Sequence, residues 1–152
     1  MTLPTLLDGE SFADVRATVR GNNPGMASDL ADRIVSDAIA FVATAARFPT
    51  ERLVPSRVVD EGWHALILHT RVYRKLCEGL GKFVHHYPER PDPGRFNQDV
   101  IDHTIMLIEE AGYTVHAELW RGPTDSLVAV AAKCQHSDDG GPIVVQPKPK
   151  PS

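Results

Sequence analysis

Apolar residues recur every three or four positions along three stretches of the chain, 28–47, 56–78 and 97–111. This spacing is typical of helices that bury one face. The predicted inward positions of the first stretch are Leu30, Ile34, Ala38, Phe41, Val42 and Ala45. Those of the second are Val59, Trp63, Leu66, Thr70, Tyr73 and Cys77, and those of the third are Val100, Ile101, Thr104, Ile105 and Ile108. Because no stretch alternates like a strand, the pattern predicts an all-α fold, a small bundle of three principal helices.

The helix boundaries carry their own signals. Ser28 and Ser56 are candidate N-caps, since a serine hydroxyl can accept a hydrogen bond from the first helical turn. Gly79 and Gly81 are expected to end the second helix, and Gly112 the third, because glycine readily adopts the left-handed conformation that closes a helix.

Shorter elements are expected around this core. A short helix is predicted over 12–19, and a turn at 118–120 should dock Trp120. A last helix is predicted over 126–133, where the helical spacing continues. The predicted organisation is a loose lead at 1–10, one helical domain at 11–136 and a disordered Pro/Gly-rich tail at 137–152.

Charge and composition narrow the function classes. The 152 residues include 16 basic and 20 acidic side chains, for a net charge of -4. This balance argues against a general nucleic-acid binder and against an electrostatic membrane anchor. Two distant cysteines, Cys77 and Cys134, imply no disulfide framework. With neither a secretory signal nor a membrane-length apolar run, we expect a cytoplasmic protein.

The chemically distinctive segment runs from Asp60 to Pro88. Asp60 and His64 lie one helical turn apart and project from one stripe. A chain that turns back at 79–81 could bring His85 or His86 over them. Two imidazoles and a carboxylate suit zinc or iron, so Asp60, His64, His85 and His86 are the candidate metal ligands.

Other interpretations of this segment stay open. An Asp–His pair at this spacing is often a surface ion pair, and a His-His doublet often bonds loop carbonyls. The same groups could form a buried polar cluster without metal, or paired histidines that respond to pH. The main alternative is a non-catalytic interaction or accessory module that binds a protein partner or a small molecule. Whether the protein is an enzyme is left open, since no phosphate loop or serine-nucleophile motif occurs.

The same residues carry a family resemblance. The stretch 59–70 reads Val-Asp-Glu-Gly-Trp-His-Ala-Leu-Ile-Leu-His-Thr, and Phe-Val-His-His-Tyr-Pro follows at 83–88. This combination resembles a small bacterial protein family related to the plant glycine-rich domain-containing proteins, whose mark is an Asp-x-x-Trp-His helix. Leu66 stands where the plant members have a second histidine, and the glycine-rich tail is missing. The resemblance implies a shared polar site and no particular activity.

Remaining candidates are assigned structural roles. Cys77 lies on the predicted core face and should be buried. His103 and His116 are isolated in the sequence, so we expect them to be structural or exposed. Cys134 and His136 are expected to belong to an ordinary helix end.

Overall fold

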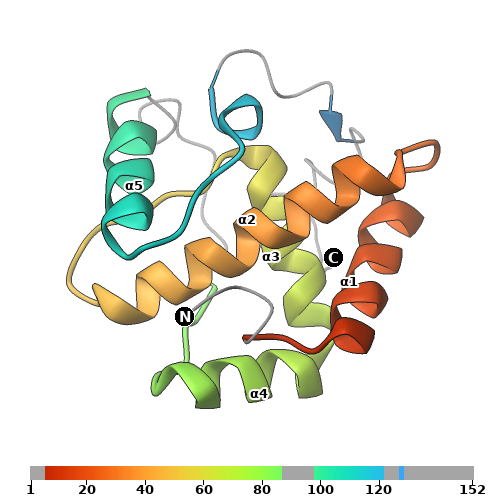
Figure 1. The fold of residues 1–152 in the computed structure, drawn as a ribbon, viewed down its shortest axis with the longest axis horizontal. Helices are drawn as coiled ribbons and strands as arrows, with labels where there is room; N and C mark the ends of the chain where they lie inside the picture. Colours follow the sequence, from red (N-terminus) through yellow and green to blue (C-terminus); the bar gives the residue numbers. More distant parts are fainter. Residues whose placement is uncertain (1–5, 87–97, 122–126, 129–152) are drawn as a thin grey trace, which may run out of the picture.

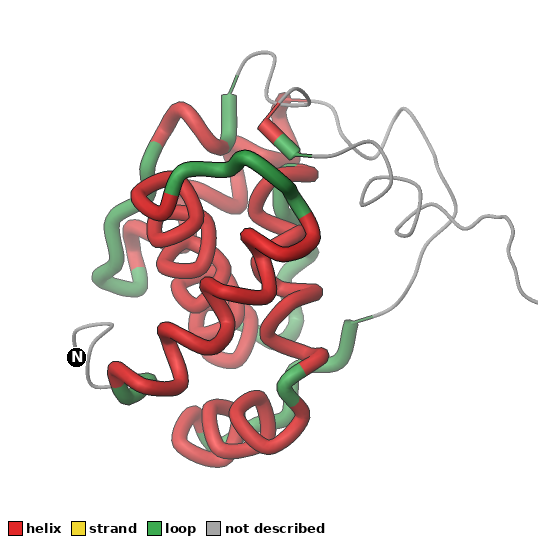
Figure 2. The backbone as a smooth tube through the Cα atoms, turned by 90° about the vertical axis from the view of Figure 1, so that its right-hand side faces the viewer, coloured by secondary structure: helices red, strands yellow, loops and turns green. Residues whose placement is uncertain are grey.

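The computed structural model describes residues 6–86, 98–121 and 127–128. All the regular structure in these ranges is helical, as Figure 2 shows, which confirms the all-α prediction. The elements are α1 (Gly9–Asn22), α2 (Ser28–Arg47), α3 (Arg57–Leu68), α4 (Thr70–Leu80), α5 (Gln98–Glu110) and the short 3₁₀ helix η3 (Ala117–Leu119). The predicted helix at 126–133 and the predicted tail lie outside the described residues, apart from 127–128.

Helix α2 is the centre of the bundle. It runs across the molecule in Figure 1 and packs against α1, α3, α4 and α5. Every residue from 37 to 44 is buried. A helix covered on several sides must be apolar around most of its circumference, and this run is apolar except for Asp37 and Thr44. A charged residue in such a run requires partners.

The crossing of α2 and α3 depends on a glycine. A Cβ atom at Gly62 would lie 2.8 Å from the Ile34 carbonyl oxygen and 2.9 Å from the Ala38 Cβ. Any side chain at this position would clash, so the backbone of α3 at Gly62 lies directly against Ile34 and Ala38 of α2. This close approach fixes the position of α3, the helix that carries Asp60 and His64, relative to α2.

The prediction of one helix over 56–78 is wrong, because α3 and α4 are separate. At His69 the backbone leaves the helical region, with φ -89° and ψ 77°, and the His69 Nε2 lies 2.6 Å from the Thr18 Oγ1. Thr70, placed inward by the continuous pattern, is exposed. The break turns α4 onto a new course, on which Tyr73, Leu76 and Cys77 are still buried.

Three of the predicted helix ends are confirmed, those at Ser56, Gly81 and Gly112. Gly112 closes α5 in the left-handed conformation, with φ 99°. Ser56 accepts a hydrogen bond from the Val59 amide at 3.1 Å. Gly81 closes α4 in the left-handed conformation, with φ 81°. The prediction for Ser28 is wrong, because Ser28 is the first residue of α2 and Ala27 occupies the cap position without a side-chain bond. Gly79 does not end α4 either, since the helix continues to Leu80.

Helix α1 is longer than the predicted 12–19. The Asp8 carboxylate accepts a bond from the Ser11 amide at 2.8 Å, so the helix begins before the apolar pattern does. The hydrogen bond to Ser11 also lowers the pKa of Asp8.

The predicted core is confirmed, since Phe41, Trp63, Leu66 and Ile108 are all buried. The predicted docking of Trp120 is also confirmed, because its side chain is buried directly after η3. Among the described residues, no helix is both long and apolar enough to cross a membrane.

Polar bonds attach the C-terminal elements to the rest. The Thr104 hydroxyl of α5 accepts from the Val54 amide at 3.0 Å. The Ser56 hydroxyl donates to the Leu119 carbonyl at 2.6 Å, so this N-cap of α3 also holds η3.

Candidate polar site

Asp60 and His64 lie on α3 at the margin of the core. They flank Trp63, whose ring packs inward against Phe41 with ring centroids 5.0 Å apart. The Asp60 side chain is only 17% exposed, and His64 is also partly buried. A carboxylate in this position is partly dehydrated and still within reach of solvent.

The chain returns to α3 after α4 along a path that Tyr73 defines. The Tyr73 hydroxyl accepts a hydrogen bond from the Trp63 Nε1 at 3.0 Å and donates one to the Val84 carbonyl. Burial raises the pKa of Tyr73, so its hydroxyl keeps the proton that it donates. Val84 itself is buried, and the return segment 82–86 is therefore held against α3 at its centre.

The return path brings His86 to Asp60. The His86 Nε2 lies 3.1 Å from the Asp60 Oδ1, and each side chain is 17% exposed. The His86 ring also meets Trp63 edge-on, with centroids 4.5 Å apart, and its centroid lies 6.4 Å from that of His64. Asp60, His64 and His86 thus form a cluster of three side chains around the outer edge of Trp63.

The two members of the histidine doublet have different environments. His85 is exposed, and its ring packs against the exposed Phe83 with centroids 4.7 Å apart. His86 is therefore the member that meets Asp60. Within the described ranges, no three His, Cys, Asp or Glu side chains are arranged to hold a metal ion.

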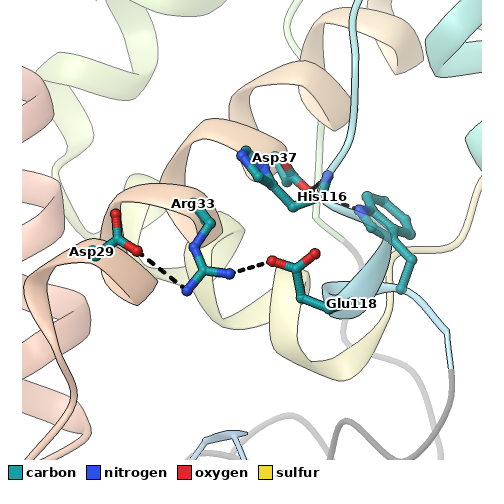
Figure 3. Close-up of polar contacts among 6 residues, drawn as sticks. Asp29, Arg33, Asp37, His116 and Glu118 are labelled. Atoms are coloured by element: carbon teal, nitrogen blue, oxygen red, sulfur yellow. Dashed lines mark hydrogen bonds and ion pairs between the residues drawn. The ribbon is translucent and has the colours of Figure 1, made fainter.

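A second aspartate–histidine pair joins α2 to the segment around η3, and the sequence analysis missed it. Asp37 of α2 is fully buried and accepts from the backbone amide and the ring of His116, at 2.9 and 2.7 Å. It also accepts from the Trp120 Nε1 at 2.9 Å. Figure 3 shows these groups converging on one carboxylate. His116 is thus not isolated, although 79 residues separate it from its partner.

Arg33 extends this second cluster along α2. Its guanidinium lies 3.4 Å from the Asp29 carboxylate one turn earlier and also binds Glu118 of η3 (Figure 3). A backbone hydrogen bond, together with Arg33, lowers the pKa of Glu118. One stripe of α2 therefore holds the segment 116–120 through both a buried and an exposed contact.

The remaining titratable groups make contacts of their own. The buried Glu61 accepts from the Asn23 Nδ2 at 3.0 Å, which connects the end of α1 to α3. His103 lies 3.0 Å from Glu51 on the surface, and Cys77 is buried as predicted. Cys134 and His136 lie outside the described residues.

Comparison with known proteins defines a family. The model of the UCP032817-like family matches residues 10–98, more than half of the chain, and the protein belongs to that family. No significant match was found among curated proteins or among solved structures. The matched range contains Asp60, His64 and His86 but not His116. The proposed kinship with plant glycine-rich domain-containing proteins stays a prediction.

Proposed function

We propose that this protein binds one divalent metal ion, zinc or iron, through Asp60, His64 and His86. The observation that carries the proposal is the contact between His86 and Asp60, two residues that are 26 positions apart in the chain. An imidazole nitrogen of His86 and a carboxylate oxygen of Asp60 are in contact, and His64, which follows Asp60 by one helical turn, has a second imidazole.

The distances support a site that needs only a small closure. Ligand atoms around a tetrahedral zinc, each about 2.0–2.1 Å from the metal, lie roughly 3.3 Å from one another. The Asp60 Oδ1 and His86 Nε2, 3.1 Å apart, match such an edge. Two imidazoles on one zinc have centroids roughly 5.2–5.5 Å apart by the same geometry. The 6.4 Å between His64 and His86 is about 1 Å wider, so His64 would move inward on binding.

The surroundings also suit a metal ligand set. Ligand histidines are commonly held in place by groups behind them. His86 rests on Trp63, and the Trp63 indole is in turn fixed by Tyr73. His85 is outside the proposed ligand set, because it packs on Phe83.

Zinc titration of the full chain, purified without a histidine tag and followed by calorimetry, tests this proposal. We expect one zinc per chain, with the affinity reduced at least about tenfold in His64→Ala and in Asp60→Asn. The matched control is His103→Ala, which removes a surface histidine that also lies beside a carboxylate. It should leave binding unchanged.

Two results would contradict the proposal. One is no zinc uptake by the wild-type chain, and the other is uptake that the His64 and Asp60 variants retain. Either result would favour the second candidate, an interaction module in which the Asp60–His86 pair only fastens the return segment to α3. That candidate is supported by the placement of the pair at the end of this segment.

A further inference from the structure

The outward face of α4 carries a line of positive charge. Arg71, Arg74, Lys75 and Lys82 are all exposed. Arg74 and Lys75 lie three and four positions after Arg71, so these three residues lie on one side of α4, and Lys82 follows directly after the Gly81 that ends the helix. Glu78 lies within the same line and is exposed as well. We call these five residues the α4 basic stripe.

The cations of the stripe differ from those elsewhere in the bundle. The arginines of α1 and α2 have acceptors in the protein, as in the Arg16–Asp32 pair at 2.9 Å and the Arg33–Asp29 pair. Within the part of the chain that the structure describes, the four cations of the stripe make no hydrogen bond or ion pair; Lys75 acts on Asp8 only at longer range, as a minor cause of its lowered pKa. In Figure 1, α4 lies along one edge of the molecule, so its outward face is accessible to a partner.

We infer that the α4 basic stripe is a docking surface for a short acidic segment of another protein. Arginine forms paired hydrogen bonds with carboxylates, and two arginines one turn apart suit two carboxylates at helical spacing. The chain also exposes a large apolar side chain on either side of α4, Leu68 before it and Phe83 after it. An acidic segment that carries apolar residues as well could use both kinds of contact.

Charge distribution favours a short acidic segment over an extended anionic surface. Four cations and one carboxylate give the stripe a net charge of +3. Because the whole chain has a net charge of -4, the remaining residues together carry -7. A membrane or a nucleic acid would extend past the stripe, and the net negative charge of the rest of the chain disfavours its approach. Glu78 inside the stripe would also be repelled by a uniform layer of phosphates. A short peptide contacts the stripe alone.

The test uses the full chain and a fluorescent 14-residue helical peptide with glutamates on one face and leucines on the other. Binding is followed by anisotropy at low salt. We expect the wild type to bind, with Arg74→Glu weakening binding about tenfold or more. Arg52→Glu is the matched control, since it makes the same change of net charge at an exposed loop position. It should weaken binding less than about twofold.

Three outcomes would overturn the inference. The first is no binding of the peptide by the wild type, and the second is a loss of binding in Arg52→Glu as large as that in Arg74→Glu. The third is binding to phosphatidylserine vesicles in place of the peptide, lost in Arg74→Glu, which would assign the stripe to a membrane. Zinc uptake measured on the same variants keeps this test separate from that of the proposed metal site.

Discussion

Two aspartate–histidine pairs of the protein, Asp37–His116 and Asp60–His86, differ in their surroundings. Asp37 is fully buried, and both of its oxygens accept hydrogen bonds from His116 and Trp120. Asp60 is partly exposed at the edge of the core, and its Oδ1 meets His86. The first pair joins α2 to the segment around η3, and the second joins α3 to the segment after α4.

The difference shows how burial changes the role of the same two groups. A buried carboxylate is stable only when donors surround it, and the three donors of Asp37 come from one short segment. We therefore assign a structural role to Asp37. Asp60 keeps contact with solvent and has a second imidazole, that of His64, nearby. For this reason we place the proposed metal site at Asp60 and not at Asp37.

The largest effect on stability is expected from removal of the buried carboxylate. Asp37→Ala leaves the donors of His116 and Trp120 without an acceptor, and the free energy of unfolding should fall by about 3–5 kcal/mol. Asp60→Ala is the matched change at the other pair and should lower it by about 1 kcal/mol or less. Urea denaturation of both variants measures the difference. Equal losses would contradict the contrast between the two pairs.

A substitution at Gly62 tests the close crossing of α2 and α3, the helices that carry Asp37 and Asp60. Gly62→Ala places a Cβ 2.8 Å from the Ile34 carbonyl oxygen and should force α2 and α3 apart, at a cost of about 1–3 kcal/mol. Gly79→Ala is the matched control, because nothing lies within 4 Å of its added Cβ. That change should be neutral or stabilise α4 by up to about 1 kcal/mol. Thermal denaturation decides, and a Gly62→Ala variant as stable as the wild type would show that the crossing is not tight.

The sequence predicted the helices better than their junctions. Helical spacing located α2 and α5 and the buried faces of α3 and α4, because burial of one face imposes a period that composition displays. It did not predict the break at His69, where Leu66 and Tyr73 continue the apolar rhythm on both sides. At the break His69 makes a tertiary contact with Thr18 of α1, and no local pattern encodes such a contact.

The candidate site was only partly predictable for the same reason. The spacing of one helical turn predicted that Asp60 and His64 share one side of a helix. Gly79 and Gly81 predicted that the chain turns back after this helix. Which histidine of the doublet would meet Asp60 depended on the bonds of Tyr73 to Trp63 and Val84, made between separate elements. Asp37 had one signal in the sequence, a charge inside an apolar helical run, but its partner His116 could not be found by spacing.

A small stability effect is expected on the path that leads to the Asp60–His86 pair. Tyr73→Phe removes the hydroxyl that accepts from Trp63 and donates to Val84, so the free energy of unfolding should fall by about 1 kcal/mol. The segment 82–86 would lose its central attachment, and the NMR signals of the His86 ring should move as the ring shifts relative to Trp63 and Asp60. Tyr113→Phe is the matched control, since the Tyr113 hydroxyl makes no hydrogen bond within the described residues.

That control should leave both stability and the His86 signals unchanged. The two readouts separate two roles of Tyr73. A loss of stability with unmoved His86 signals would mean that the hydroxyl only fills its place in the core. His86 signals that move in Tyr73→Phe and stay in Tyr113→Phe would mean that Tyr73 positions the imidazole. Because Asp37 is held by donors of another segment, the His116 signals should be unaffected by either change.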